Sequence, residues 1–217
     1  MTDPRTGILD AAETLFGDLG LAATSLRAIT SAAGVNAAAV NYYFRSKDAL
    51  FLAVCARGPG RINAQCVEML ERCERARPSG PLPLEEVIEA FVAPMLRAGG
   101  APKLIGRIYR EPQQTLPSAV LSLIDELAGR FAPGLQRALP DRDRTDLRRS
   151  FILIVGMLAQ VMLTSDPTAG NCDTAEIEEV SRRIVSFACA GLRSLPPIRP
   201  SPDPSSAGHR TDIARSA

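Results

Sequence analysis

The stretch of sequence that decides the fold is SLRAITSAAGVNAAAVNYYFRSK, residues 25–47. Thr24 or Ser25 can cap a helix that starts here, because a side-chain hydroxyl accepts a hydrogen bond from an otherwise unpaired backbone N–H. Gly34 suits the end of that helix, and Asn36 is a good cap for the next one. The stretch therefore predicts two short helices joined by a tight turn, which is a helix-turn-helix.

The second of these helices, predicted over 37–44, has one apolar and one open face. Val40 and Phe44 lie four positions apart and so share the inward face. The outward face is left with small and polar residues, namely Ala37, Ala38, Asn41 and Tyr42. Small side chains allow a helix to approach base edges in the major groove of DNA, which admits one α-helix. Because two short capped helices also occur in ordinary helical proteins, the pattern alone fits both a DNA-binding unit and a plain structural one.

Positive charge is concentrated in this stretch. Arg27, Arg45 and Lys47 carry three positive charges, and the stretch contains no Asp or Glu. The whole chain has 25 basic and 24 acidic residues, so its formal net charge is only +1. A near-neutral chain that binds phosphates needs this kind of local concentration. Tyr42 and Tyr43 add phenol groups that can donate to phosphate oxygens.

The sequence on both sides of the stretch is also helical in pattern. Apolar residues at the helical period predict a preceding helix, with Gly20 at its end: Ile8, Leu9, Ala12, Leu15, Phe16 and Leu19. Ser46 can cap a fourth helix, which Gly58-Pro59-Gly60 should break. Further helices are predicted near 62–75, 84–97, 102–111, 117–138, 143–165 and 174–194.

The predicted fold class is therefore all-α, with an N-terminal three-helix helix-turn-helix domain followed by a helical body. Residues 1–50 are expected to form the DNA-binding domain, and residues 51–194 the effector-binding and dimerisation domain. Residues 195–217 are rich in Pro, Ser and charge, which predicts a disordered tail. The length of 217 residues suits one small unit and one larger one.

The stretch and its flanks resemble the N-terminal domain of the TetR family of bacterial regulators. The resemblance covers about residues 5–55 and includes the helix that begins Ile8-Leu9-Asp10-Ala11-Ala12. The matching motifs are Thr24-Ser25, Ile29, Ala33-Gly34-Val35, Tyr42-Tyr43-Phe44 and Lys47-Asp48-Ala49-Leu50. The resemblance implies a transcriptional regulator that binds DNA through this domain.

Two positions depart from the family's usual pattern. The family often has Tyr where Asn41 stands and His where Tyr43 stands. The sequence pattern Val-Asn-Tyr-x-Phe-x-Ser-Lys, at residues 40–47, resembles that of a subgroup typified by the fatty-acid-responsive regulator PsrA. Asn41 is therefore compatible with function, and Tyr43 keeps a phosphate contact while changing its pH dependence.

The resemblance also implies which residues touch DNA. Contacts from the first helix of the motif are expected from Ser25 and Arg27. The groove would be lined by Asn36, Ala37, Ala38 and Asn41, and phosphates would be held by Tyr42, Tyr43 and Lys47. Phosphate contacts position the protein, whereas base contacts specify the sequence, so Ala37, Ala38, Asn41 and Arg27 are the better candidates for specificity.

A homodimer is expected, because a two-fold dimer reads a palindromic operator in double-stranded DNA. The run Phe151 to Leu163 is apolar all round and so must bury more than one face. The resemblance implies that the predicted helices near 143–165 and 174–194 form the dimer interface. A core helix in a monomer is the alternative interpretation of this run.

A small hydrophobic effector, such as one with an acyl chain, is the expected ligand of the body. Apolar residues that could line its pocket are Leu104, Ile108, Tyr109, Leu121 and Ile124. A mostly apolar pocket with few polar groups is typical of such sites. The hypothesis is a repressor that this effector releases from DNA. A helical small-molecule-binding protein that no longer reads DNA is the alternative, and the acid-free basic stretch argues against it.

No enzyme, metal site or cofactor is expected. The single histidine is His209, and no phosphate-binding loop, nucleophile elbow or metal-ligand cluster is present. The five cysteines include no CxxC pair, which favours buried, reduced thiols over a redox sensor. The run from Phe151 is about 13 residues long, shorter than a membrane-spanning helix needs. A cytoplasmic protein without a membrane partner is therefore expected.

Overall fold

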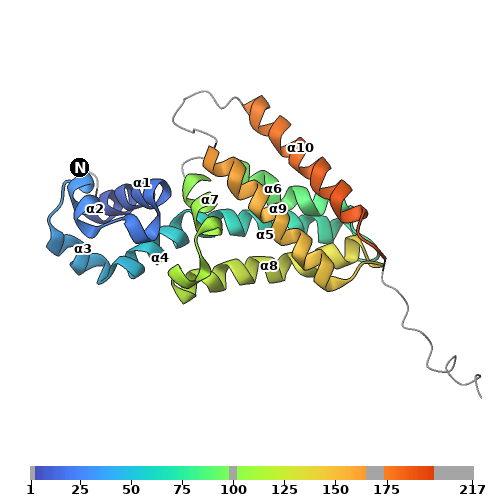
Figure 1. Ribbon diagram of the computed structural model, residues 1–217, viewed down its shortest axis with the longest axis horizontal. Coiled ribbons are helices and arrows are strands. Elements are labelled where there is room, and N and C mark those ends of the chain that lie inside the picture. Colours follow the sequence, from blue (N-terminus) through green and yellow to red (C-terminus); the bar gives the residue numbers. More distant parts are fainter. Residues whose placement is uncertain (1–2, 98–101, 165–173, 198–217) are drawn as a thin grey trace, which may run out of the picture.

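The computed structural model of the chain describes residues 3–97, 102–164 and 174–197, and these are helical with short connections (Figure 1). The helices are α1 (Pro4–Ala23), α2 (Leu26–Ala33), α3 (Ala37–Phe44), α4 (Lys47–Arg57), α5 (Pro59–Ala76), α6 (Leu84–Leu96), α7 (Pro102–Arg110), the short 3-10 helix η1 (Gln113–Thr115), α8 (Ser118–Ala138), α9 (Arg144–Thr164) and α10 (Thr174–Arg193). The all-α prediction is confirmed for this part of the chain. Most of the tail predicted over 195–217 lies outside the described residues.

Helices α1 to α4, here called the N-terminal unit, form one end of the molecule (Figure 1). Helices α2 and α3 have eight residues each, and helices that short are not stable in water on their own. They are held by burial against α1, whose Ile8, Ala12 and Phe16 are fully buried. Phe16 also meets Phe51 of α4 edge to face, with ring centroids 4.9 Å apart.

The end of α1 differs from the sequence prediction. Gly20 does not end the helix but kinks it, with φ 82° and ψ 169°, and the chain turns once more to Ala23. The turn is retained because Leu21 is buried and because the Thr24 hydroxyl donates to the carbonyl of Gly20 at 2.7 Å. Leu19, expected in the buried stripe, is instead 49% exposed.

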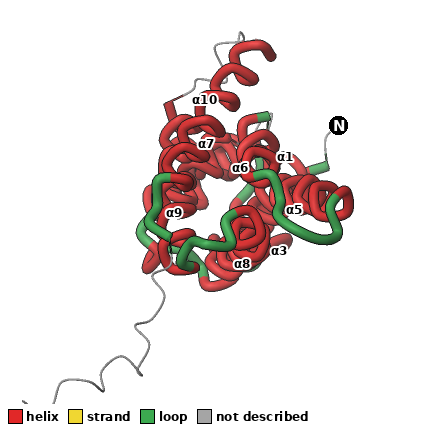
Figure 2. The backbone as a smooth tube through the Cα atoms, turned by 90° about the vertical axis from the view of Figure 1, so that its right-hand side faces the viewer, coloured by secondary structure: helices red, strands yellow, loops and turns green. Residues whose placement is uncertain are grey.

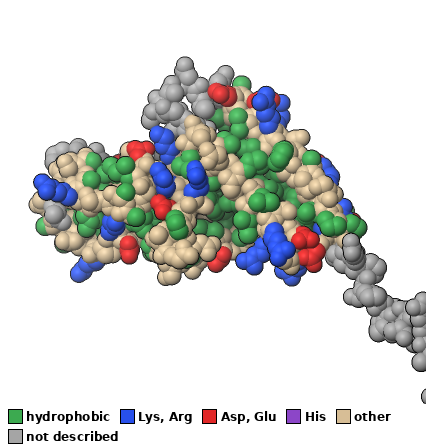
Figure 3. Space-filling model, viewed as in Figure 1, with side chains coloured by type: hydrophobic (Ala, Val, Ile, Leu, Met, Phe, Trp, Pro, Cys, Tyr) green, Lys and Arg blue, Asp and Glu red, His purple; other side chains and the backbone are tan. Residues whose placement is uncertain are grey.

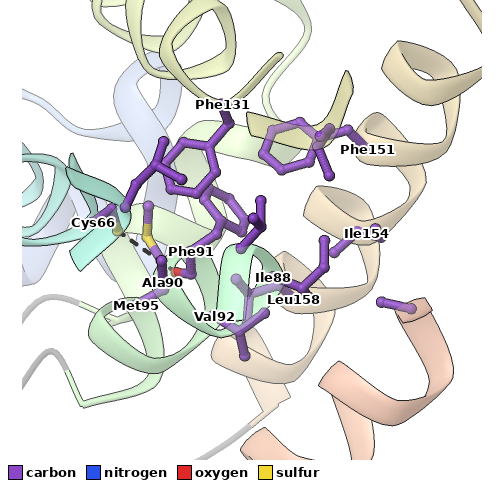
Figure 4. Packing of buried hydrophobic residues seen from close by; sticks show 14 of the residues in the cluster. Cys66, Ile88, Ala90, Phe91, Val92, Met95, Phe131, Phe151, Ile154 and Leu158 are labelled. Carbon is purple, nitrogen blue, oxygen red and sulfur yellow. Dashed lines mark hydrogen bonds between the residues drawn. The ribbon is translucent and has the colours of Figure 1, made fainter. Parts of the chain in front are cut away.

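Helices α5 to α10, here called the body, enclose a second apolar core. Figure 2, an end-on view, shows α5, α6, α8 and α9 around a common interior. That interior is filled by Phe91, Phe131 and Phe151, which come from α6, α8 and α9 and have ring centroids 4.9 to 5.9 Å apart (Figure 4). Helix α10 packs mainly on α6 and also on α9.

Helix α7 connects the N-terminal unit to the body, because it packs on α1 on one side and on α9 on the other. Glycines permit both approaches. A Cβ on Gly17 of α1 would lie 3.3 Å from the backbone nitrogen of Leu104, and one on Gly106 would lie 2.8 Å from the carbonyl oxygen of Ala159. Arg107 also donates to the carbonyl oxygen of Asp18 at 2.8 Å.

The apolar core of the N-terminal unit therefore does not stop at residue 50. Val54 and Cys55 of α4 belong to it, as do Leu104 of α7 and Val120 of α8. Without the apolar residues that α7 and α8 contribute, the N-terminal unit would expose apolar surface to water. The division at residue 50 stays a prediction, and the packing indicates a continuous junction.

Helix α9 leaves an apolar face uncovered. By length and composition alone, it is the one helix in the described ranges that could cross a membrane. One side of α9, which carries Leu147, Phe151 and Leu158, is buried in the body core, as in a core helix of a soluble protein. Its other side exposes Ile152 and Leu153, and apolar atoms gather over α9 on this face of the molecule (Figure 3).

The close approach of α7 and α9 predicts a steric effect at Gly106. We expect Gly106→Ala to lower the free energy of unfolding by about 1–3 kcal/mol, since the added methyl must displace the α9 backbone or Leu163. Gly129, within α8, has no atom near its Cβ position, so Gly129→Ala is the matched control and should be neutral or stabilising by up to about 1 kcal/mol. Urea unfolding measures both, and equal effects would contradict the packing.

Candidate nucleic-acid interface

Helix α3 has the two faces that the sequence predicted. Val40 and Phe44 are buried against α1. Ala38 and Asn41 are exposed, Tyr42 is 78% exposed and Tyr43 is on the edge of the exposed side. Ala37 is the first residue of α3, but its side chain lies outside the described residues. The structure thus brings the expected groove-facing residues of α3 onto one open surface.

The helix caps fix how α2 and α3 are presented. The Ser25 hydroxyl oxygen accepts from the backbone N–H of Ala28 at 3.1 Å, and the Asn36 Oδ1 accepts from that of Ala39 at 2.9 Å. Gly34 makes the turn between them with φ 65°, a left-handed conformation that suits glycine. Ser25 and Asn36 therefore act as helix caps in this structure. Each still has a donor, the hydroxyl hydrogen or the amide NH2, for DNA.

Lys47 makes contacts inside the protein that the sequence did not predict. Its Nζ donates to the carbonyl oxygens of Leu21 at 2.9 Å and Thr24 at 3.1 Å. The side chain is half-buried and fastens the end of α1 to the start of α4. Unpaired carbonyls at a helix end need donors, and a charged donor makes a strong hydrogen bond. Lys47 thus holds the N-terminal unit together, and its contact with phosphate stays a prediction.

Three arginines supply the open positive charge instead. Within the described ranges, no carboxylate pairs with Arg5, Arg27 or Arg45, and all three are exposed. In contrast, Arg57 bonds the carboxylates of Asp10 and Glu13, and these hydrogen bonds raise its pKa even though partial burial opposes them.

Arg5 was missed by the sequence analysis. Its guanidinium carbon lies 5.5 Å from the centroid of the Phe44 ring, which places a cation at the C-terminal end of α3. No local pattern signals this position, because α1 and α3 are brought together only by their shared core. The one available sign was a basic residue near the start of the helix predicted to precede the motif.

A shallow hollow runs along the open side of α3. It has a volume of about 530 Å³ and is lined by Pro4, Gly34, Val35, Asn36, Ala38, Ala39, Tyr42 and Tyr43. The two tyrosine rings meet edge to face, with centroids 5.0 Å apart and planes at 83°. Both rings line the hollow together with Val35, Ala38 and Ala39.

Four of the five expected effector-pocket residues lie in or against one apolar core, and the fifth packs against the other. Leu104 and Ile108 are buried in the core of the N-terminal unit, and Leu121 and Ile124 pack against the same core. Tyr109 alone packs against the body core, and burial raises the pKa of its phenol. Four of the five therefore lie where the N-terminal unit meets the body. Helix α7 packs on α9 as well as on α1.

The cysteines fit the expectation of buried thiols. Burial raises the pKa of Cys55 and of Cys66 to about 12, and that of Cys189 to about 11. Burial is also the largest cause of the raised pKa of Cys73. A thiol is reactive as its thiolate, so these four residues stay protonated near neutral pH. Cys172 lies outside the described residues.

The fold and this open surface define a helix-turn-helix regulatory protein with a helical body. Residues 8–54 match the model of the bacterial regulatory proteins of the tetR family. Residues 89–191 match the model of the tetracyclin repressor-like C-terminal domain. The chain belongs to the TetR family of bacterial transcriptional regulators.

Solved structures share the fold. A TetR-like transcriptional regulator from Rhodococcus sp. RHA1 is 24% identical over 89% of this chain and 98% of its own, with a TM-score of 0.61. The fatty acid degradation regulator FadR from Bacillus halodurans is 15% identical over 89% and 98%, with a TM-score of 0.62. SCO4454, a TetR-family regulator from Streptomyces coelicolor, is 19% identical over 88% and 95%, with a TM-score of 0.61. No curated protein matches the sequence.

The backbone of Arg45 predicts a split between stability and DNA affinity. This residue has φ 67° and ψ −39°, a conformation that costs a non-glycine residue free energy. We expect Arg45→Gly to raise the free energy of unfolding by up to about 1 kcal/mol while weakening DNA binding through the lost charge. Arg45→Ala is the control, because it removes the charge and keeps the strained backbone. A less stable Arg45→Gly protein would contradict the assignment of strain.

Proposed function

We propose that this TetR-family regulator is a repressor that binds a palindromic operator as a homodimer and is released by a small hydrophobic effector. The observation that carries the DNA-binding part is the open side of α3, flanked by arginines that no described carboxylate pairs with. The proposal assigns no catalytic activity to the chain and places it in the cytoplasm. Its parts are argued separately below.

Phosphate contacts come from the C-terminal end of α3 and from the start of α2 in this proposal. Arg5, Arg45 and the hydroxyls of Tyr42 and Tyr43 hold the backbone near its C-terminal end. The capped start of α2 at Ser25 offers free N–H groups and a hydroxyl donor to another phosphate. Nearer the base edges the proposal places the exposed residues Arg27, Asn36, Ala38 and Asn41, together with Ala37 at the start of α3.

The exposed apolar side of α9 supports a homodimer. Leu153 is 74% exposed, and Phe187 of the neighbouring α10 is 71% exposed. A second copy that lays its own α9 and α10 on this face would bury both sets of side chains. A two-fold dimer then presents two α3 helices to successive major grooves about 34 Å apart. If α9 were instead the core helix of a monomer, these side chains would stay exposed to water.

The effector proposal rests on the apolar body core and on resemblance. The aromatic cluster of Phe91, Phe131 and Phe151 lies beside Cys66 and Tyr109, which gives an apolar interior with few polar groups. The structurally similar FadR from Bacillus halodurans is a fatty acid degradation regulator, and the α3 sequence resembles the PsrA-type subgroup. An acyl-chain compound is therefore proposed as the effector.

Release follows if the effector prefers a body conformation in which α7 shifts. Leu104, Ile108, Leu121 and Ile124 join the N-terminal unit to α7 and α8, so we assign them to transmission of the change. The effector moves the equilibrium only by its preference for the released state, and a sharp switch needs about 5 kcal/mol.

The DNA-binding proposal predicts how binding depends on salt. Purified protein is titrated with DNA fragments from its own upstream region over a salt series. We expect Arg45→Ala to weaken binding and to reduce the slope of log affinity against log salt by about one unit, because it removes a phosphate contact. Arg72, which pairs with Glu68 on α5, supplies the control Arg72→Ala, whose affinity and slope should equal those of the native protein.

The alternative function, a helical small-molecule-binding protein that no longer reads DNA, has a distinct outcome in this assay. It predicts only weak binding with the same affinity for every fragment. If a genome-wide search for bound sites also found none, the DNA-binding proposal would be wrong.

The dimer proposal predicts that charge at the exposed apolar face separates the copies. We expect the double variant Leu153→Glu, Phe187→Glu to sediment as a folded monomer, because two buried charges would meet their own symmetry mates. Leu19→Glu changes another exposed apolar residue away from this face and should leave the dimer intact. A native protein that sediments as a monomer at micromolar concentration would contradict the proposal.

A further inference from the structure

The start of α3 carries methyl groups where a DNA-reading helix commonly carries hydrogen-bonding side chains. Its first three residues are Ala37, Ala38 and Ala39. Ala38 is exposed and lies in the floor of the hollow, with Ala39 half-buried beside it. Asn36, just before them, already uses its side-chain oxygen as the helix cap. The first turn of α3 therefore offers apolar contact in place of direct polar recognition.

Asn41 supplies a polar group within α3 on the open side before the tyrosines. Asn41 lies one turn after Ala38, on the same face of the helix. It is exposed, and its side-chain amide makes no hydrogen bond within the part of the chain that the structure describes. Its amide carries both a donor and an acceptor, so it can bond two atoms of one base.

The major groove has a matching chemistry. The 5-methyl group of thymine is the apolar feature of its base edges, and alanine contacts that methyl well. A side-chain amide matches adenine, which presents an acceptor at N7 and a donor at N6. An alanine turn followed by one asparagine thus fits A·T pairs better than G·C pairs.

We propose that α3 reads A·T pairs, with Ala38 against a thymine 5-methyl group and the Asn41 amide on an adjacent adenine. This inference rests on the proposed DNA-binding function and names the sequence class of its site. The hollow supports it, because Pro4, Val35 and Tyr42 extend the apolar surface around Ala38. A methyl placed there leaves water and contacts carbon, which stabilises the complex.

The first test isolates the methyl groups on the DNA side. The native protein selects its sites from a random duplex pool, and the selected half-site is then synthesised with each thymine replaced in turn by uracil, which lacks only the methyl. We expect at least one replacement in each half-site to weaken binding about fourfold, which corresponds to one methyl group removed from contact. Because the protein is unchanged, no folding defect can imitate the result.

The second test links that methyl to Ala38. Ala38→Gly should weaken binding to the thymine site and should show little further loss on the uracil site, since one partner of the contact is already missing. Ala32→Gly, at an exposed position of the equally short α2, is the matched control and should retain the full preference for thymine. Circular dichroism checks that both variants keep their helices.

The Asn41 part is tested with 7-deazaadenine, which removes the N7 acceptor alone. A single adenine per half-site should be sensitive to this change in the native protein and insensitive in Asn41→Ala. If the enriched half-site binds equally well with uracil and with 7-deazaadenine throughout, this inference is overturned while the DNA-binding function stands. If no sequence is enriched, the proposed function fails and the inference fails with it.

Discussion

Burial of α1 from two directions is the constraint on which the rest of the structure depends. One side of the helix packs Ile8, Ala12 and Phe16 against α2, α3 and α4, and the other side packs against α7. The motif helices have too few residues to form alone, so their geometry is the geometry that α1 imposes. Because α1 also meets the body, a change in the body can reach α3 without any flexible linker between them.

Polar contacts set the register of this junction. The Lys47 ammonium, at the start of α4, donates to carbonyl oxygens at the end of α1. The Arg107 guanidinium, on α7, donates to the carbonyl oxygen of Asp18 in α1. Both cations bond carbonyl oxygens at the C-terminal end of a helix, where the helix dipole also favours positive charge. These two cations are therefore used to hold α1 in place. Arg5, Arg27 and Arg45 are exposed, and no described carboxylate pairs with them.

The sequence predicted the elements that local chemistry determines. Ser25, Gly34 and Asn36 have the expected cap and turn geometry, and Val40 and Phe44 are buried as their spacing indicated. It did not predict contacts between segments far apart in the chain. The carbonyl partners of Lys47 and the ring beneath Arg5 depend on how α1 crosses α3 and α4. The same limit applies to the expected effector residues, since an apolar face of α7 fits a pocket or a helix contact equally well by pattern.

The most direct test of this account is site-specific photocrosslinking, with a benzophenone amino acid incorporated at one position at a time in the protein bound to its selected DNA. In place of Tyr42 on the open side of α3, the group should crosslink to DNA. In place of Phe187 on α10, it should crosslink one chain to a second copy and not to DNA. DNA crosslinks from the Phe187 position together with none from the Tyr42 position would contradict the account, because DNA would then lie on the body.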